Sequence, residues 1–525
     1  MSLIKCKSRA LVAMIFCIFI GYMFVVNISL IKSPVMKFIQ RKIDFKLTTK
    51  EIATNYASKK LKYRYFFINV NGFFARMSGR RLYNNVLLLK SKMLTHAKIE
   101  KNSQIGKTIE KTIELANFTK ELNIPFVYIA APYKVSTLKD NIPEGIVNYA
   151  NENTDVFLKG LTDAGIDTLD LRPLLSSTSD QVKKYFYSTD HHWNPDGAFV
   201  AFQTIIDKIE TIQFENRKLN KNYTRINQWK RLEKKDWFLG AHGKRVGTKF
   251  AGTDSLIYYI PKFSTRMSLA VPHHNQIFKG DFVTANIRKT YIEKKDYFYY
   301  NAYCVYIGGD YPLVSHRNIN APNKMKVLVI KDSYVLPLQA FMSTVFSEID
   351  VIDPRFYKAS TIAEYITWTK PDIVLMVRYA GSTGSNDFHY NNFITKVIHS
   401  YREDEVLLKD YDVQMSASKA THRNNKLPIS LRAGKTYSIS FNNVIVAQGK
   451  TDGVSILLYD SKSKKAVNHK IFDVEFCKKN HEDAKWTFNV PEEDSDFSLL
   501  VYAGVLGKTT NVGVEYRGIK VSSLN

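Results

Sequence analysis

Cysteine is scarce in this chain, with only four in 525 residues. Cys6 and Cys17 lie in or beside an apolar N-terminal stretch, and Cys304 and Cys477 are far apart in the sequence. No pair has the C-x-x-C spacing of a zinc or redox site, and four cysteines so placed do not make a disulfide framework. The sequence therefore predicts neither a zinc site nor a fold held together by disulfides.

Acidic residues are also under-represented, because 75 Lys and Arg stand against 49 Asp and Glu, a formal net charge of +26. Such an excess predicts attraction to polyanions, which include nucleic acids, anionic lipid headgroups and anionic glycans. Charge alone does not choose among them, and a generally basic proteome would explain it equally well. The hydrophobic content of 45% excludes wholesale disorder. A chain of this length should form two or three domains.

One long uncharged apolar run, residues 10–31, follows Lys5, Lys7 and Arg9 near the N-terminus. About 20 helical residues cross the ~30 Å hydrocarbon core of a bilayer, whereas a cleavable signal peptide has a shorter apolar core and small residues at the cut site. Basic residues before the run predict that this end stays inside. We therefore expect residues 1–32 to be an uncleaved transmembrane signal anchor. The rest of the chain is expected on the extracytoplasmic (periplasmic or cell-surface) side, where no nucleic acid is met.

Behind this segment, residues 33–104 are basic and aromatic, which is typical either of a helical stem at the membrane or of the first layer of a folded domain. Residues 105–402 then alternate apolar strand patterns with helical patterns. Alternation of this kind predicts an α/β domain with a mostly parallel sheet covered on both faces. A stretch at about 229–323, rich in Gly, aromatics and Lys/Arg, interrupts the alternation and is expected to be an insertion, or a set of strands and loops, packed over the site.

Residues 403–525 change character again and run in short β-like segments separated by turn residues. The spacing predicts an all-β sandwich. Two interpretations of it remain open: a carbohydrate-binding module, or a sandwich that only packs against the preceding domain.

Two short motifs carry the chemistry. Ser333 follows the apolar strand pattern 327–330 and precedes the helical pattern 335–346, so it lies at the carboxyl end of a strand, where open α/β sheets keep their sites. Asp190 stands two residues before His192, and alternate side chains of an extended turn share a face. Asp190 and His192 would then pair while His191 points away. A serine beside an Asp-oriented histidine is an activated nucleophile.

Residues 188–198 (STDHHWNPDGA) resemble the signature of the bacterial DHHW family. That family is similar to the SGNH-hydrolase-like alginate O-acetyltransferases of exopolysaccharide systems, where a threonine usually occupies the position of His191. Residues 330–334 and 353–357 resemble the family's nucleophile block and the strand after it. Residues 238–261, with GTD at 252–254, look similar to its central region. The resemblance covers roughly residues 105–378, and the C-terminal segment more weakly resembles the carbohydrate-binding sandwich of one alginate enzyme.

This resemblance implies an SGNH-like (flavodoxin-like) fold with Ser333 as nucleophile, His192 as general base and Asp190 as its orienter. The Asp-His motif precedes the Ser, so the motif order is circularly permuted relative to ordinary SGNH esterases. At the family level it implies an extracytoplasmic enzyme that moves acetyl groups onto, or occasionally off, a surface polysaccharide. The acetyl donor would be handed over by a membrane-bound acyltransferase partner.

Further candidates surround this triad. The backbone N–H groups of Ser333 and Tyr334 are expected to stabilise an oxyanion. Gly309 lies in a Gly-Gly loop that would supply a second donor or simply turn the chain. Arg355 is expected to hold an anionic substrate, with a structural salt bridge as the alternative, and His191 is a competing base.

The paired histidines 191–192 and 273–274 lack the H-E-x-x-H spacing of a helical metal site, so no metal is expected, and no cofactor.

Three functions remain open from the sequence. The first is an O-acetyltransferase acting on a cell-surface or secreted polysaccharide, anionic or neutral. The second is an acetylesterase that uses the same triad, and the sequence does not separate the two, because they differ in whether the acyl-enzyme excludes water. The third is a non-catalytic glycan-binding or assembly protein in which the triad is vestigial.

Overall fold

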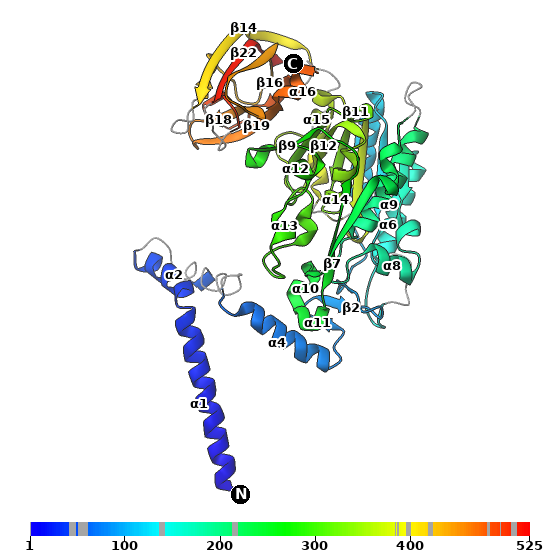
Figure 1. Ribbon diagram of the computed structural model, residues 1–525, viewed down its shortest axis with the longest axis vertical. Coiled ribbons are helices and arrows are strands. Elements are labelled where there is room, and N and C mark those ends of the chain that lie inside the picture. Colours follow the sequence, from blue (N-terminus) through cyan, green and yellow to red (C-terminus); the bar gives the residue numbers. More distant parts are fainter. Residues whose placement is uncertain are drawn as a thin grey trace. The chain divides into compact units, whose positions relative to one another are not determined.

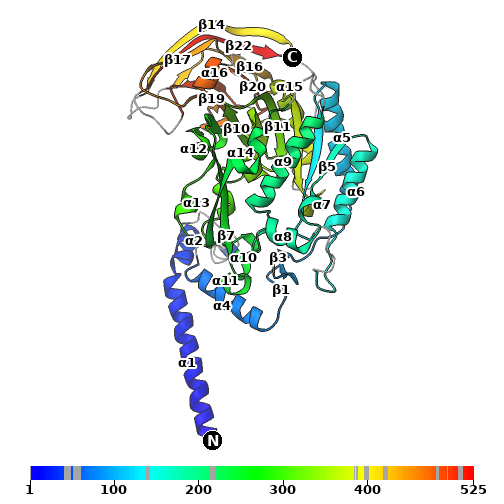
Figure 2. The same ribbon diagram turned by 45° about the vertical axis from the view of Figure 1, so that its right-hand side comes forward.

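The computed structural model describes residues 2–40, 49–50, 61–135, 142–212, 219–383, 385, 388–394, 401–417, 424–479, 484–493, 495–505 and 512–525 (Figures 1 and 2). Its contacts divide the chain into two compact units. The smaller one comprises Met1–Asn84 and Gly243–Gly252, and the larger one comprises Asn85–His242 and Thr253–Asn525.

The smaller unit is mostly helical. Its elements are α1 (Ser2–Val26), α2 (Ser29–Ile39), α4 (Arg64–Met77), the two-residue strand β1 (Leu82–Tyr83) and α11 (Thr248–Ala251). Asn69 on α4 accepts hydrogen bonds from the backbone N–H and the hydroxyl of Thr248, at 2.8 and 3.0 Å. A Cβ at Gly72 would lie 1.9 Å from the carbonyl oxygen of Val246, so α4 requires glycine at this close approach. The prediction for residues 33–104 falls partly on 41–48 and 51–60, which lie outside the described residues.

The apolar run predicted as a transmembrane helix is divided between two helices, since α1 ends at Val26 and α2 begins at Ser29. At about 1.5 Å per residue, the part of the run that lies in α1 measures about 25 Å, which is less than the ~30 Å of a hydrocarbon core. Among the described residues, no helix has both the length and the apolar character needed to cross a membrane. The predicted transmembrane helix is therefore not found there.

An eight-stranded sheet forms the centre of the larger unit, in the order β5-β4-β13-β11-β12-β10-β8-β9. Its first five strands are parallel, as the sequence predicts, and the last three add in antiparallel fashion. The strands are β4 (Phe126–Ala131), β5 (Asp167–Asp170), β8 (Met267–Val271), β9 (Gln276–Gly280), β10 (Leu313–Asn318), β11 (Asn323–Lys331), β12 (Phe346–Ile352) and β13 (Ile373–Tyr379). The predicted insertion thus extends the sheet by three strands.

Five helices cover the two faces of this sheet (Figure 2). Those on one face are α9 (Pro195–Thr211) and α14 (Val335–Met342), which share a core with Val327 and Val329 of β11. Those on the other face are α5 (Ile105–Glu121), α6 (Ala150–Asp163) and α15 (Ile362–Thr369), which share a core with Leu328 and Ile330. Successive residues of a strand point to opposite faces, so a fully apolar β11 fills both cores. The α/β prediction is confirmed.

Smaller elements connect these layers. They are β2 (Val86–Leu88) and β3 (Leu94–His96), which pair as a hairpin, α7 (Arg172–Leu175), α8 (Ser179–Tyr185), α10 (Ala241–Val246), α12 (Phe282–Asn286), α13 (Thr290–Glu293), the 3₁₀ turn η5 (Ala302–Val305), and the antiparallel pair β6 (Trp229–Phe238) and β7 (Asp254–Pro261).

The C-terminal region is rich in β-strands, as predicted. One sheet has the order β14-β22-β16-β20, with β17 also paired to β22, and the other has the order β15-β21-β18-β19. The elements are β14 (Glu403–Ala417), β15 (Asn424–Lys426), β16 (Thr436–Ser440), β17 (Asn443–Gln448), β18 (Gly453–Asp460), β19 (Lys465–Asp473), α16 (Val474–Lys479), β20 (Lys485–Asn489), β21 (Phe497–Tyr502) and β22 (Val512–Leu524).

Apolar side chains from both of these sheets form one core of their own. Lys279 of β9 is ion-paired with Asp473, at 2.8 Å, and so ties the region to the α/β sheet. Sugar binding by this region, and the predicted domain boundaries, stay predictions.

Candidate active site

The nucleophile candidate lies on a short turn between β11 and α14. Asp332 anchors this turn, because its carboxylate accepts the N–H of Tyr334 at 3.0 Å and the N–H of Tyr379 at 2.7 Å. Ser333 is left partly exposed between two buried neighbours. The placement follows the sequence prediction: a strand end, a serine and a helix start at the carboxyl edge of the parallel strands.

The Asp-His motif lies on a tight loop. Phe186 and Trp193 form an antiparallel bridge at its base, and the chain bends through residues 188–192 between them. Trp193 then donates its indole N–H to the carbonyl of Tyr334, at 2.9 Å. The next residue, Asn194, caps α9 by accepting the N–H of Gly197 at 3.1 Å. The loop is therefore fixed both to the nucleophile turn and to a long helix.

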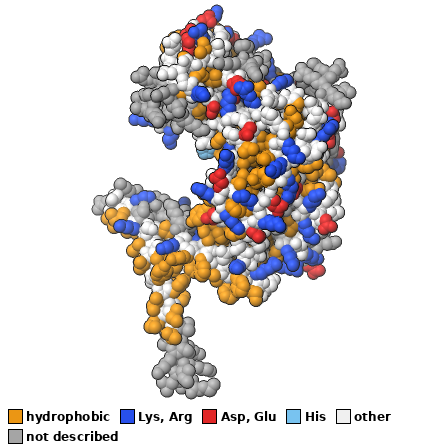
Figure 3. Space-filling model, viewed as in Figure 1, with side chains coloured by type: hydrophobic (Ala, Val, Ile, Leu, Met, Phe, Trp, Pro, Cys, Tyr) orange, Lys and Arg blue, Asp and Glu red, His pale blue; other side chains and the backbone are white. Residues whose placement is uncertain are grey.

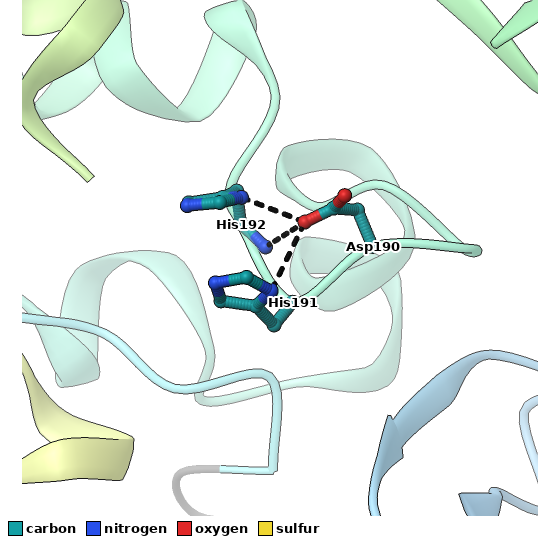
Figure 4. Close-up of side chains that lie close together, drawn as sticks. All are labelled: Asp190, His191 and His192. Atoms are coloured by element: carbon teal, nitrogen blue, oxygen red, sulfur yellow. Dashed lines mark hydrogen bonds and ion pairs between the residues drawn. The ribbon is translucent and has the colours of Figure 1, made fainter. Parts of the chain in front are cut away.

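Three side chains form a hydrogen-bonded chain. The Nδ1 atom of His192 lies 2.6 Å from Oδ1 of Asp190, and its Nε2 atom lies 2.8 Å from Oγ of Ser333 (Figure 4 shows the first contact). Serine and histidine are 141 positions apart in the sequence. Geometry of this kind allows the imidazole to take the hydroxyl proton while the carboxylate orients the ring.

The imidazole of His192 lies between two other rings. Tyr303, on η5, stacks on it with ring centroids 3.8 Å apart and planes 12° apart. The ring of His191 also lies 3.8 Å from that of His192, at an angle of 36°. Two rings at such short distance cannot share one face, so they cover opposite faces of His192. Rotation of the base away from Ser333 is thereby restricted.

His191 does not point away from Asp190, contrary to the sequence expectation. Its Nδ1 atom lies 3.2 Å from the same carboxylate oxygen that contacts His192 (Figure 4). The reason is the backbone, which bends at 188–192 instead of running extended, so that side-chain directions no longer alternate. No contact with Ser333 is found for His191 in the described part of the chain, and His192 alone reaches the hydroxyl.

Asp190 remains ionised in this fully buried position. Burial raises the pKa of its carboxyl, but electrostatic interaction with the His192 and His191 rings and the hydrogen bonds from His192 and Ala241 lower it, and the balance lies well below the ordinary value. Burial also holds the pKa of His191 well below its usual range, reinforced by the neighbouring His192. The Asp190 carboxyl is therefore ionised, and the His191 imidazole is neutral.

A short segment after β6 closes over the Asp-His loop. The N–H of Gly240 donates to the hydroxyl of Thr189, at 2.7 Å, and the N–H of Ala241 donates to Oδ2 of Asp190, at 2.6 Å. A Cβ at Gly240 would lie 2.4 Å from the Cβ of Asp190, so only glycine allows the approach. The Gly-rich composition here indicated a turn but not the contact with Asp190.

Sequence reasoning also missed Lys134 and Tyr303. Lys134 is fully buried and donates to three backbone carbonyls, one of which belongs to Asp190. The hydroxyl of Tyr303 donates to the carbonyls of Ser333 and Tyr334, both at 2.9 Å. The one sequence signal for Lys134 is its position shortly after an apolar strand and Pro132. Tyr303 gives no such signal, because it is one of many aromatic residues in the insertion.

One predicted oxyanion donor, Tyr334, is placed differently from expectation, while the role of Gly309 stays a prediction. The backbone N–H of Tyr334 already donates to Asp332, and the hydroxyl of Tyr334 donates to the carbonyl of His191. Tyr334 therefore links the nucleophile turn to the Asp-His loop instead of facing a substrate. Gly309 follows Ile307 and Gly308 in a turn whose three φ angles are all positive, at 67, 108 and 150°. A β-branched residue at φ 67° is strained, and such strain clusters at functional sites.

Arg355 is engaged in ion pairs. Its guanidinium forms two hydrogen bonds with Asp353, at 2.8 and 2.6 Å, and lies 3.3 Å from Asp310. Asp310 also pairs with the buried Lys331, which immediately precedes the nucleophile turn. The geometry favours the structural alternative for Arg355: it belongs to a charge network that holds the end of β11.

One group of metal-ligand side chains has its atoms within 4.8 Å of one another in the described part of the chain, and it consists of Asp190, His191 and His192. Asp190 and His192 are the same groups that contact each other and Ser333, so a metal there would compete with the hydrogen-bonded chain.

Comparison with known proteins finds a match to one family and several similar solved structures. Residues 87–235 match the family described as "SGNH hydrolase-like domain, acetyltransferase AlgX". This segment contains Asp190 and His192, and Ser333 lies beyond it. Among proteins with curated functions, none matches the chain.

Three similar solved structures illustrate the range. Bacillus cereus PatB1 with a sulfonyl adduct is 24% identical, covering 58% of this chain and 97% of its own, with a TM-score of 0.49. A DHHW family protein from Eubacterium siraeum is 17% identical, covering 60% and 97%, with a TM-score of 0.48. Pseudomonas aeruginosa AlgX is 12% identical, covering 84% and 94%, with a TM-score of 0.34. The resemblance expected from the sequence is confirmed: residues 87–235 match the SGNH hydrolase-like domain of the AlgX acetyltransferase family.

Proposed function

We propose that this protein is an extracytoplasmic O-acetyltransferase that moves acetyl groups onto a cell-surface or secreted polysaccharide. The observation that carries the proposal is the Ser333–His192–Asp190 chain, with contacts of 2.8 and 2.6 Å. The match of residues 87–235 to an acetyltransferase family supports it independently.

The proposed reaction has two halves. In the first, His192 Nε2 takes the proton of Ser333 as its Oγ attacks the acetyl carbonyl of the donor, and the imidazolium then returns that proton to the leaving group. In the second, His192 takes a proton from a sugar hydroxyl, which attacks the acetyl-serine and releases Ser333 with its proton restored. Asp190 stays ionised and stabilises the imidazolium in both halves.

Stabilisation of the tetrahedral intermediate would come from the nucleophile turn itself. The N–H of Tyr334 is bonded to Asp332, and so the proposed backbone donor is the N–H of Ser333. A single well-placed donor of this kind contributes about 3–4 kcal/mol to transition-state stabilisation.

The polysaccharide substrate is inferred from the family match, and the net charge of +26 suits an anionic polymer. We also propose that the acetyl donor is delivered by a membrane-bound acyltransferase partner, as the sequence resemblance implies. The basic residues before the apolar N-terminal run favour an extracytoplasmic location. Large apolar side chains of α1 are exposed, among them Phe16, Ile18 and Val25. Figure 3 shows hydrophobic side chains along the coloured part of this helix. We propose that they contact lipid.

The test is trapping of the acyl-enzyme. The full chain is incubated with a chromogenic acetyl ester, quenched and weighed intact, beside Ser333→Ala and the matched surface control Ser177→Ala. We expect a gain of one acetyl group in the parent and in S177A but none in S333A. Added oligosaccharides should then accept the acetyl group. Transfer to water alone would indicate an acetylesterase, and folded protein with neither adduct nor turnover would overturn the proposal in favour of glycan binding.

A further inference from the structure

Two buried charged side chains form hydrogen bonds with the backbone of the Asp-His loop, one with its N–H groups and the other with its carbonyls. On the N–H side, the carboxylate of Asp254 accepts from the backbone of Ser188 and Thr189 and from the Thr189 hydroxyl, all at 2.7 Å. On the carbonyl side, the ammonium of Lys134 donates to the carbonyls of Tyr187 and Asp190. In residues 187–190 a carboxylate therefore accepts from backbone N–H groups, while an ammonium donates to backbone carbonyls.

Lys134 has no spare hydrogen-bonding capacity. Its third N–H donates to the carbonyl of Leu94, at 2.8 Å, so all three donors of the ammonium are used on backbone oxygens. The side chain is 0% exposed. Burying an ammonium in this way is costly unless its donors are all satisfied. Three carbonyls, two of them from the catalytic loop, satisfy it here.

We propose that Lys134 and Asp254 are positioning residues for the acyl-transfer reaction: together they fix residues 187–190 so that the Asp190 carboxylate meets Nδ1 of His192. Neither side chain contacts Ser333, and both act through the loop backbone. Lys134 and Asp254, with their hydrogen bonds to residues 187–190, are called the clamp below. The inference rests on the proposed function, because it assigns a catalytic consequence to this clamp. Displacement of a catalytic group by about 1 Å can lower a rate about 100-fold.

The charges around the clamp support this role. Burial lowers the pKa of Lys134 to about 8, although Asp254 and Asp190 raise it. Burial raises the pKa of Asp254, while its hydrogen bonds to Thr189 and Ser188 and the charge of Lys134 act in the other direction. His191 and His242 also face the ammonium, whose charge contributes to lowering the pKa of each. Above pH 8, a neutral amine keeps only two N–H donors for three carbonyls.

A purely structural role predicts something different. If Lys134 only stabilised the fold, its loss would lower the melting temperature but leave the folded fraction fully active. The matched control is Arg172, which is also buried and whose side chain bonds to Asp170, Asp155 and Asn151, none of which belongs to the triad or to its loop. Arg172→Met should destabilise the domain without moving the Asp-His loop.

The experiment compares the parent, Lys134→Met, Asp254→Asn, the double variant and R172M. Activity on a chromogenic acetyl ester is measured well below each melting temperature. We expect K134M to lower kcat at least about 100-fold and D254N at least about tenfold, with less than additive effects in the double variant because both act through one loop. R172M should stay within threefold. Parent-like kcat in folded K134M, or equal losses in K134M and R172M, would overturn the inference.

Two readouts remain informative if K134M does not fold. The parent should lose activity with a midpoint near pH 8, and D254N should move that midpoint to lower pH, because the Asp254 charge favours the protonated lysine. A parent whose activity is constant from pH 7 to 10 would contradict the clamp. A downfield proton resonance from the His192 Nδ1–H bond should be present in the parent and lost in D254N. This signal needs no turnover, so it tests the clamp even if the protein transfers no acetyl group.

Discussion

The phenol ring of Tyr303 stacks on the imidazole of His192, and its hydroxyl donates to the carbonyls of Ser333 and Tyr334. One side chain from the inserted region therefore contacts both the base and the backbone of the nucleophile turn. Because the phenol is fully buried, its pKa is well above the ordinary value, and it remains a donor at any pH at which the protein is folded.

We predict that Tyr303→Phe keeps the stacked ring but lowers kcat about tenfold, since two carbonyl oxygens lose a donor worth about 1 kcal/mol or more. Tyr303→Leu should lower kcat further, because the imidazole of His192 also loses its stacked ring. The measurement is the steady-state rate on an acetyl ester. Tyr297→Phe is the control, because that exposed hydroxyl donates to the carbonyl of Asp236 instead. Equal rates in Y303F and the parent would show that the hydroxyl does not help to place Ser333.

The two adjacent histidines should differ strongly in their effects. His192→Ala removes the group 2.8 Å from the Ser333 hydroxyl and should lower kcat by about 10⁴-fold or more. His191→Ala removes only a ring that restrains His192 and a second contact to Asp190, so we expect a loss below about tenfold. Rates on an acetyl ester measure both. If H191A proved as inactive as H192A, the assignment of the base would be wrong.

The alternation of strands and helices, the Ser333 turn and the Asp190-x-His192 pair were all predictable from sequence, because each rests on local periodicity or on neighbouring residues. The Ser333 turn lies at the carboxyl edge of the parallel strands, and the loop between α8 and α9 brings the Asp-His motif to it. Local reasoning did not predict the direction of the His191 side chain. An extended backbone was assumed at residues 188–192, whereas the bridge between Phe186 and Trp193 forces bends that turn His191 toward Asp190.

The supporting residues could not be predicted for a different reason. Lys134 contacts Asp190 across 56 positions, and Tyr303 contacts Ser333 across 30, with no pattern that links the pairs in sequence. Arg355 was instead foreseeable, since its partner Asp353 stands two residues away. Its position after a strand favours a substrate role from the sequence alone, but that position does not show which carboxylate the guanidinium contacts. Long-range polar contacts are what a single sequence leaves undetermined.

Gly240 offers a steric test of the active-site loop. In Gly240→Ala the new methyl group would lie 2.4 Å from the Cβ of Asp190, so Asp190 or the short segment after β6 must move. We expect a loss of about 1–3 kcal/mol in unfolding free energy together with a large loss of kcat. Gly106→Ala is the matched control, because its methyl group meets nothing within 4 Å in helix α5 and should stabilise by about 0.5–1 kcal/mol. Denaturant unfolding and ester hydrolysis measure the two effects, and a fully active G240A would contradict the close approach.

His316 should make the protein sensitive to acid. This β10 residue is buried beside Gln339, with its Nε2 atom 3.3 Å from the amide oxygen, and burial lowers its pKa to about 4. In the unfolded chain the pKa is about 6.5, so the unfolded state binds the extra proton first and stability falls as pH drops from about 6.5 to 4, by up to about 3 kcal/mol. His316→Gln, which cannot titrate, should lose less stability over this range, while His389→Gln at an exposed position should behave like the parent. Urea unfolding at pH 7, 5.5 and 4 measures the difference, and identical pH slopes for H316Q and the parent would mean that His316 takes up its proton as readily in the folded state as in the unfolded one.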